Sequence, residues 1–293
     1  MREQTVALYC VLDELIRFTR PAGTPPPATG RRLTDAQVLT TTLVAARFCG
    51  GNLVVAKHYM EQHWDQNRLD QSGFTRRLHK LTDTLLSLFA TFGDLLKHLH
   101  LEARYVLDSF PVAVYHNTRI PRCKLVAGKA YHGRCASKRS WFYGLKGQVV
   151  ATSDGVPVEF YLHAGGESEQ AGRRGRPLDL PAGSILYTDA GYTDYIAEDL
   201  FHEASGSQQQ SARRTNSKRP HHPAQNFLIQ YFHKGIETCF SQLTVRFSKQ
   251  IQAVTAAGFA LKIVLFFLST PCTKLAYRSQ PGFASREQRC YRG

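Results

Sequence analysis

Apolar residues in the first hundred positions recur at intervals of three and four, which is the spacing of helices with one buried face. Val6–Phe18 has this pattern and ends ahead of a proline-rich stretch. A second helix is predicted to begin after Thr34, because Thr34 and Gln37 form a capping-box pair. Gly50 and Gly51 supply its predicted end.

Helical spacing continues through two further segments. It covers Val54–Trp64 and then a longer stretch up to Leu99, for which Ser72 is the predicted N-terminal cap. Residues 1–103 are therefore predicted to form an all-helical domain. Basic residues gather near the start of its last helix, where they would either line a DNA-recognition helix or simply face solvent. They are Arg68, Arg76, Arg77, His79 and Lys80.

After Arg104 short apolar runs replace the helical spacing and predict buried strands. Tyr105–Leu107 is one such run and ends at Asp108, and Ile185–Tyr187 is another, closely followed by Asp189. An aspartate at the C-terminal end of a buried strand is held rigidly at the rim of the sheet. Taken singly, each acid is as readily a loop residue or a helix cap, but together they are candidate metal ligands.

A hairpin and a long helix complete the predicted second domain. Trp141–Thr152 and Val156–Leu162 alternate on either side of an Asp-Gly turn signal. Asn226–Phe247 returns to helical spacing, with Glu237 beside its apolar stripe. A helix that crosses the sheet would present this glutamate to the strand ends as a third candidate ligand.

Three segments lack a packing pattern. Ala164–Pro177 and Gly206–Pro223 are predicted to be loops or disordered arms. From Ser269 onward apolar residues become scarce, so the preceding helix is predicted to end at Leu268. The predicted domains are thus 1–103, 104–268 and a basic, poorly ordered tail, 269–293.

The charge balance favours a polyanionic partner. The 293 residues include 37 Lys and Arg against 23 Asp and Glu, a formal net charge of +14, while 43% hydrophobic residues suffice for a core. Ser109–Ser153 contains no acidic residue, so we expect this interval to face DNA phosphates. The predicted DNA contacts, including two in a later basic patch, are Arg119, Arg122, Lys124, Lys129, Lys138, Arg139, Lys146, Lys218 and Arg219.

Two parts of the acid-free interval admit another interpretation. A solvated hairpin face is the alternative to phosphate contact for Lys138 and Lys146. The aromatic run Trp141–Tyr143 would either stack on an extruded base or pack in the core, and we predict packing for two of its three side chains.

The remaining composition indicates the compartment. Seven scattered cysteines without a CxxC pair do not suggest a disulfide framework, and the first residues do not resemble a signal peptide. The most apolar run, Ile263–Leu268, is far shorter than the about 20 residues that span a bilayer. We expect a cytoplasmic, nucleoid-associated protein with no membrane partner.

Phosphodiester chemistry at neutral pH would explain acids in a basic chain. The attacking oxygen must be deprotonated and the leaving oxygen stabilised, and two Mg²⁺ (or Mn²⁺) ions held by about three carboxylates do both. Asp108, Asp189 and Glu237 are the candidate catalytic residues and metal ligands. Their convergence in space is a prediction that requires the fold.

Several blocks around these acids resemble, in order and spacing, the DDE transposases of the insertion-sequence 982 family. The resemblance extends from about Leu33 to Leu268 and is strong because many short motifs occur in register. The blocks are Leu107–Val112, Ala136–Lys138, Phe142–Lys146, Tyr187–Tyr192, Asn216–Arg219, Lys234–Ser241 and Ala253–Lys262.

This resemblance implies an α/β fold, an RNase H-like catalytic core with a mixed sheet flanked by helices, preceded by a helical DNA-binding domain. It implies that Asp108, Asp189 and Glu237 are the DDE triad of a bacterial-type insertion sequence. Water would cleave at the element ends, and the freed 3′-hydroxyl would then join target DNA. The implied partners are double-stranded DNA, as terminal inverted repeats and target, and further copies of the chain.

Two alternatives to transposition remain from the sequence. The same fold would serve a metal-dependent nuclease that has no strand-transfer step. A catalytically inactive DNA-binding derivative would use the helical domain alone, with structural acids.

Overall fold

The computed structural model describes residues 1–19, 33–64, 69–115, 126–135, 139–173, 178–246 and 255–278. Its described residues divide into two compact units. Unit 1 contains residues 1–92, Arg246 and 257–278, and unit 2 contains 93–245 with 255 and 256. Compared with the predicted domains, residues 93–103 belong with the sheet and 257–268 with the helices of unit 1.

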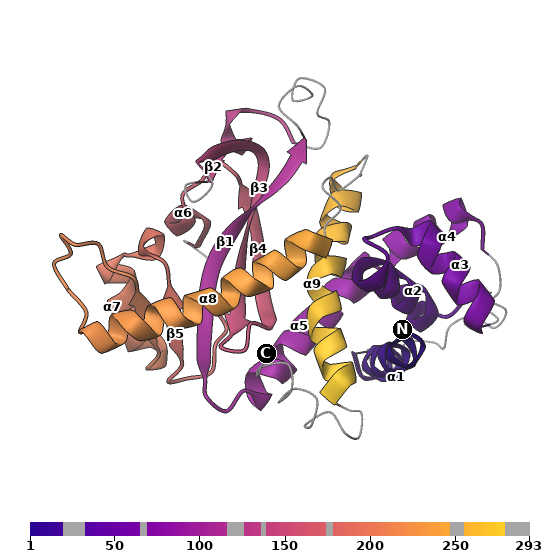
Figure 1. Cartoon of the computed structure of the whole chain (residues 1–293), viewed down its shortest axis with the longest axis horizontal. Coiled ribbons are helices and arrows are strands. Elements are labelled where there is room, and N and C mark those ends of the chain that lie inside the picture. The colour runs from indigo at the N-terminus through magenta and orange to yellow at the C-terminus, as the bar shows by residue number, and fades with distance from the viewer. Residues whose placement is uncertain are drawn as a thin grey trace, which may run out of the picture. The chain divides into compact units, whose positions relative to one another are not determined.

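Unit 1 is helical, as the spacing of its apolar residues predicts (Figure 1). Its helices are α1 (Arg2–Thr19), α2 (Asp35–Phe48), α3 (Leu53–Trp64), α4 (Gln71–Lys80), the first part of α5 (Thr82–Leu99), and α9 (Ala256–Arg278).

The capping box predicted for α2 is confirmed. The hydroxyl of Thr34 accepts a hydrogen bond from the Gln37 amide at 3.1 Å, and the Thr34 amide donates to Oε1 of Gln37 at 2.7 Å. Gly50 and Gly51 follow the helix with φ of 56° and 81°, values that favour glycine. Both ends of α2 are therefore encoded locally.

The long helix predicted from Ser72 to Leu99 is instead two helices. Asp70, not Ser72, caps α4, because its carboxylate accepts from the amide of Gly73 at 3.2 Å. The helix is interrupted at Leu81. The Thr82 hydroxyl donates to the carbonyl of His79 at 2.8 Å, which satisfies one of the acceptors that the interruption leaves without a helical partner.

Helix α9 continues to Arg278, so the predicted end at Leu268 is wrong. Ser269 lies inside the helix because its hydroxyl donates to the carbonyl of Phe266 at 2.7 Å, and Cys272 is fully buried. Nearly all described positions from Phe259 to Cys272 are buried, which is typical of a core helix. In the described part of the chain no single helix is long and apolar enough to cross a membrane; α2 and α3 meet that test only as a pair bent by 119°.

Unit 2 is built on a six-stranded sheet with the order β2-β3-β1-β5-β6, and β4 pairs with β3. β1 and β5 are parallel, as are β5 and β6, while the other pairs are antiparallel. This mixed sheet flanked by helices is the predicted fold class. The strands are β1 (Arg104–Tyr115), β2 (His132–Cys135), β3 (Ser140–Thr152), β4 (Pro157–Ala164), β5 (Ile185–Thr188) and β6 (Gln208–Ser211).

The first strand does not end at Asp108 as predicted. β1 is 12 residues long and reaches Tyr115, because β3 pairs with it along almost its whole length. Its ladder with β5 stops after Leu107, so the later part of β1 lacks a β5 partner on that side. Pro111 has no N–H to donate and is tolerated in this part of the strand. The hairpin of β3 and β4 is confirmed, with Gly155 at φ 70° in its turn.

Both segments predicted to be loops contain regular structure. Gly206–Pro223 includes β6, and Ala164–Pro177 includes the short helix α6 (Glu169–Arg173). Two polar residues of β6, Gln209 and Ser211, are buried with partners: Nε2 of Gln209 donates to the carbonyl of Tyr192 at 3.2 Å and to Ser211 Oγ at 2.8 Å. A polar strand of this kind carries no apolar signal in the sequence.

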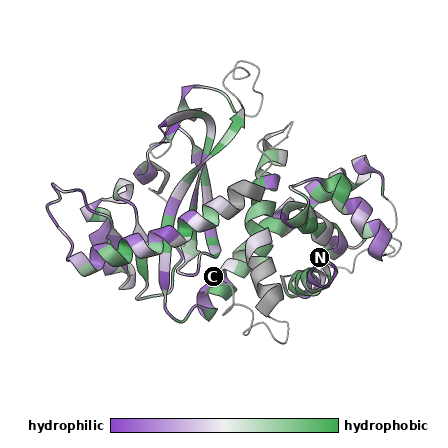
Figure 2. Ribbon diagram, viewed as in Figure 1, coloured by the Kyte–Doolittle hydropathy of each residue, from purple (hydrophilic) through white to green (hydrophobic). Residues whose placement is uncertain are grey.

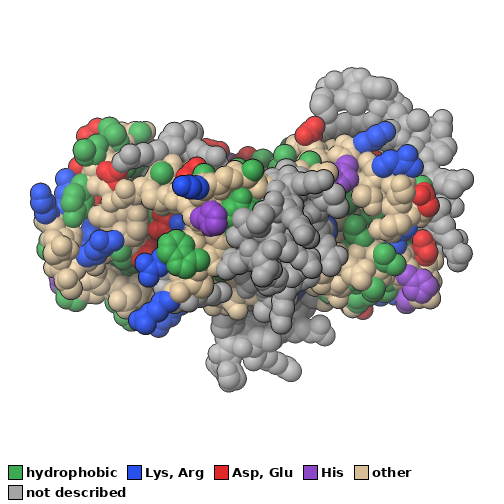
Figure 3. Space-filling model, turned by 90° about the horizontal axis from the view of Figure 1, so that it is seen from above, with side chains coloured by type: hydrophobic (Ala, Val, Ile, Leu, Met, Phe, Trp, Pro, Cys, Tyr) green, Lys and Arg blue, Asp and Glu red, His purple; other side chains and the backbone are tan. Residues whose placement is uncertain are grey.

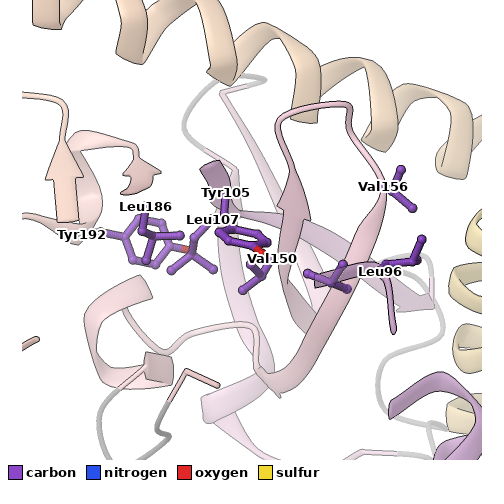
Figure 4. Packing of buried hydrophobic residues seen from close by; sticks show 8 residues of the cluster. Leu96, Tyr105, Leu107, Val150, Val156, Leu186 and Tyr192 are labelled. Atoms are coloured by element: carbon purple, nitrogen blue, oxygen red, sulfur yellow. The ribbon is translucent and has the colours of Figure 1, made fainter. Parts of the chain in front are cut away.

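The sheet of unit 2 packs helices on both faces. On one face Tyr105 and Leu107 join a core cluster with Leu96 of α5 and Leu186 of β5 (Figure 4). The opposite face is crossed by α8 (Pro223–Arg246), as Figure 1 shows. Rings of α8 contact the sheet, with centroids 4.7 Å apart for Tyr187 and Phe232 and 4.9 Å for Phe110 and Phe240.

Helix α7 (Tyr195–Ser205) packs beside β6 and was not predicted from the sequence. Asp194 caps it by accepting from the amide of Ala197 at 3.3 Å, and Gly206 ends it in the left-handed conformation at φ 65°. Both signals are present in the sequence, so this helix was predictable.

Candidate functional site

The register of the parallel ladder brings Asp108 and Asp189 together. Leu107 pairs with Thr188 as the last matched position of β1 and β5, and each of these residues is followed directly by one of the aspartates. Matched positions on neighbouring strands lie about 4.8 Å apart. Asp108 also lies on the face that α8 crosses, since side chains alternate along a strand and Phe110 contacts that helix.

The two aspartates differ in exposure. The side chain of Asp108 is 15% exposed, and its Oδ1 accepts a hydrogen bond from the amide of Ser109 at 2.7 Å. Asp189 is exposed and caps the 3₁₀ helix Ala190–Tyr192, where its Oδ1 accepts from the amide of Ala190 at 2.6 Å. One carboxylate is therefore shielded and the other is open to solvent.

Helix α8 places Glu237 over the same face, with His233 one turn before it. Nε2 of His233 lies 3.4 Å from Oδ2 of Asp108, and its Nδ1 lies 3.8 Å from Oε1 of Glu237. The Glu237 side chain is 65% exposed. The imidazole thus stands between a carboxylate from the sheet and one from the helix, a role the sequence interpretation missed although the i, i+4 spacing was visible.

Glu169 is a fourth carboxylate at this place and was also missed. Its Oε1 accepts a hydrogen bond from the hydroxyl of Ser109 at 2.9 Å, and its backbone carbonyl accepts from Nε2 of Gln148 at 2.6 Å. A Cβ on Gly191 would collide with the Glu169 carboxylate, so a larger residue there would displace that carboxylate. The signal for α6 was the cap Ser168, whose Oγ accepts from the amide of Ala171 at 3.1 Å.

The electrostatics of Asp108 reflect this crowding. Burial raises the pKa of its carboxyl to about 7 from 3.8, and the carboxylates of Glu169 and Asp189 act in the same direction. His233 and the Ser109 amide partly oppose that rise. A divalent cation would relieve a buried acid beside two further carboxylates, so the donor set suits a hard metal ion.

The acids are not yet arranged as a closed ligand cage. Within the described ranges, no group of three or more His, Cys, Asp or Glu side chains lies close enough to hold a metal ion. Asp108 and Asp189 are adjacent, while Glu237 contacts His233. We refer to Asp108, Glu169, Asp189, His233 and Glu237 as the acidic site.

The predicted DNA contacts fall into three groups. Lys129, Arg139 and Lys218 are exposed. Lys146 donates to the carbonyl of Glu167 at 3.1 Å, and Arg219 forms a two-point ion pair with Asp199 at 2.7 and 2.9 Å. Arg119, Arg122, Lys124 and Lys138 lie outside the described residues.

The aromatic run on β3 behaves as predicted. Phe142 and Tyr143 are buried, whereas Trp141 is 68% exposed, so two of the three side chains pack. The guanidinium of Arg134, on the paired strand β2, lies 5.9 Å from the Trp141 ring.

Comparison with known proteins gives one match. A family model described as a transposase DDE domain matches residues 100–251, a range that includes Asp108, Asp189 and Glu237. No curated protein and no solved structure matches the chain.

Proposed function

Because the chain belongs to the transposase DDE domain family, we propose that it is a DNA transposase whose catalytic triad is Asp108, Asp189 and Glu237. The observation that carries the proposal is the strand register, which sets Asp108 beside Asp189 on the face that α8 crosses with Glu237. Sequence motifs alone would not require Asp108 and Asp189 to lie side by side, whereas the strand register does.

The acidic site would hold two divalent ions, Mg²⁺ or Mn²⁺. When bound, the ions would activate the attacking oxygen and stabilise the leaving oxygen of a phosphodiester. Asp108 provides a shielded, rigid carboxylate, and Asp189 an exposed one that substrate can reach. Glu237 is exposed on α8 and would turn toward the aspartates in place of its contact with His233.

We assign the reaction as cleavage at the ends of an insertion sequence, followed by attack of the 3′-hydroxyl on target DNA. The resemblance of the sequence blocks supports an element of the insertion-sequence 982 type. The net charge of +14 suits a protein that binds two DNA segments. Pairing of two element ends would require a multimer of this chain.

The proposal is tested with DNA that carries the sequences flanking this gene. We expect Mg²⁺-dependent cleavage at inverted repeats, reduced at least 100-fold by Asp108→Asn, Asp189→Asn or Glu237→Gln, with DNA binding retained because only negative charge is removed. Glu203→Gln is the matched control, since Glu203 is exposed on α7 away from the acidic site. Wild-type cleavage by the Asp189→Asn protein would show the triad assignment to be wrong.

A pre-cut donor end separates a transposase from a nuclease. Donor DNA with a free 3′-hydroxyl is incubated with a target plasmid and Mg²⁺. Joined products support strand transfer, whereas cleavage without joining identifies a nuclease. Absence of both reactions, with DNA binding intact, identifies an inactive DNA-binding derivative.

Glu169 provides a specific test of the third ligand. It influences the pKa of Asp108 and lies against Ser109, whereas Glu237 reaches Asp108 only through His233. If Glu169→Gln reduces cleavage more than Glu237→Gln does, Glu169 and not Glu237 would be the third metal ligand.

A further inference from the structure

A pocket of about 550 Å³ opens in unit 2 directly beside the acidic site. One side of the pocket is lined by Ala190 and Gly191, the residues that follow Asp189. The other side is formed by the segment between β6 and α8. No described residue that lines it is acidic, although carboxylates lie close by. Figure 2 colours the β6–α8 segment largely as hydrophilic.

Two charge pairs anchor this segment on α7. Both terminal nitrogens of Arg213 donate to the Glu198 carboxylate, at 2.8 and 2.5 Å, and both side chains are only 7% exposed. Arg219 makes the equivalent two-point pair with Asp199, the next residue of α7. Paired geometry of this kind is strong and directional, so the segment is held in one place.

Tyr195 forms the wall between these anchors. The guanidinium groups of Arg213 and Arg219 lie 5.0 and 4.9 Å from its ring centre. The hydroxyl of Tyr195 is hydrogen-bonded to Oγ of Ser217 at 2.8 Å. Two guanidinium groups therefore already contact the Tyr195 ring and would compete with a DNA base for it.

Two cations of the same segment remain for a ligand. Arg214 and Lys218 are exposed and line the pocket, and neither forms an ion pair with any described carboxylate. Hydroxyl and amide donors, including Ser217 and Asn216, complete the lining. Several Lys and Arg side chains lie on the visible surface in the left part of Figure 3.

We propose that this basic pocket binds a backbone phosphate of the DNA strand that the acidic site cleaves, with Arg214 and Lys218 as its cationic contacts. The inference rests on the proposed function and adds a substrate-positioning site to it. Ala190 and Gly191, which line the pocket, directly follow Asp189 in the short 3₁₀ helix Ala190–Tyr192, so the pocket adjoins the acidic site.

The lining favours phosphate over the other ligands that DNA enzymes hold. A metal ion would need carboxylates, which the pocket lacks, and an extruded base would need an uncovered aromatic face. Arg, Lys, hydroxyl and amide donors are the groups that bind DNA phosphates. Arg219, predicted from the sequence as a DNA contact, is paired with Asp199, whereas Arg214 was not among the predicted contacts.

The test measures binding of the full-length protein to a fluorescein-labelled random DNA duplex by anisotropy, in EDTA so that no cleavage occurs. The Arg214→Ala/Lys218→Ala protein loses two phosphate contacts, so the slope of log K against log salt falls by about 1.8. Between about 50 and 200 mM salt, wild-type affinity therefore drops roughly tenfold more than that of the variant. Arg2→Ala/Arg17→Ala, which removes two exposed cations of α1, is the matched control.

Unchanged affinity and slope in the double variant would overturn the proposal. The Arg214→Lys/Lys218→Arg protein keeps both charges and should bind DNA as the wild type does. Weaker binding by this protein would indicate misfolding, and an equal loss of affinity in the α1 control would indicate an effect of bulk charge. Either result would also overturn the proposal. If inorganic phosphate competes with DNA but the Arg214→Ala/Lys218→Ala substitutions leave DNA affinity unchanged, the pocket would be assigned to free phosphate instead. Because no metal is present, failure of the catalytic proposal would leave these binding results intact.

Discussion

Burial of Asp108 dominates the chemistry of the acidic site at the scale of single residues. Its carboxyl is shielded by α8, and carboxylates of Glu169 and Asp189 raise its pKa further. The imidazole of His233 lies against this carboxyl and partly opposes the rise in its pKa, and it is placed one helical turn from Glu237. A bound cation would replace the imidazole in that role and free Glu237 to approach the aspartates.

The raised pKa predicts how stability depends on pH without metal. Below about pH 4 Asp108 is protonated in both the folded and the unfolded states, so it costs nothing. As pH rises from 3.8 toward 7, the unfolded carboxyl releases its proton while the folded one retains it, and the free energy of unfolding falls by up to about 1.4 kcal/mol per pH unit. The Asp108→Asn protein should lack this component.

Urea unfolding of both proteins in EDTA at several values of pH measures the difference. We expect the wild type to lose stability relative to Asp108→Asn as pH rises, and Mg²⁺ to restore it at neutral pH only in the wild type. Parallel pH profiles for the two proteins would contradict the assigned pKa.

At the scale of elements, the close approach of α5 to β4 fixes one side of the sheet. A Cβ on Gly93 would collide with the backbone carbonyl of Val158. Beyond it, Nζ of Lys97 is buried and lies 3.0 Å from Oε1 of Glu159 on β4. Apolar packing and a buried charge pair thus hold the same helix end.

Gly93→Ala should therefore destabilise unit 2 even though alanine favours helices. We expect a loss of about 1–3 kcal/mol from the forced separation of α5 and β4, more than the about 1 kcal/mol gained in helix propensity. Ser87→Ala, at an exposed position of the same helix, is the control and should be neutral or slightly stabilising. Equal unfolding midpoints for Gly93→Ala and the wild type would show that the backbone adjusts freely.

At the scale of the whole molecule, each unit draws on distant parts of the chain. α9 belongs to unit 1, although the sheet of unit 2 separates it in sequence from α1 to α4. Phe266 of α9 lies against Gly51, where a Cβ would be 3.1 Å from the ring. The core of unit 1 therefore depends on a helix that follows the sheet of unit 2 in the sequence.

Phe267→Ala tests this division. Phe267 is fully buried in α9, so its truncation should cost unit 1 about 3–5 kcal/mol. Hydrogen exchange should report lost protection in α2, with β1 of unit 2 unaffected. Ala257→Ser, at an exposed position of α9, is the control, and loss of protection in β1 instead of α2 would contradict the assignment of α9.

Local signals in the sequence determined most helical spans of unit 1, the hairpin and the stripe of α8, because caps, turns and periodicity act over a few residues. They did not reveal the break at Leu81 or the extension of α9 beyond Leu268. They also singled out Asp108 and Asp189 by their position after apolar runs. They did not reveal β6, a polar strand that pairs with β5 and buries Gln209 and Ser211.

Only the tertiary structure decided what surrounds the acids. Strand register set Asp108 beside Asp189, and packing of α8 and α6 brought His233 and Glu169 to them. These contacts join residues that are far apart along the chain, and no local pattern encodes such distances. For the same reason the sequence alone could propose Glu237 as a ligand but could not show that His233 lies between it and Asp108.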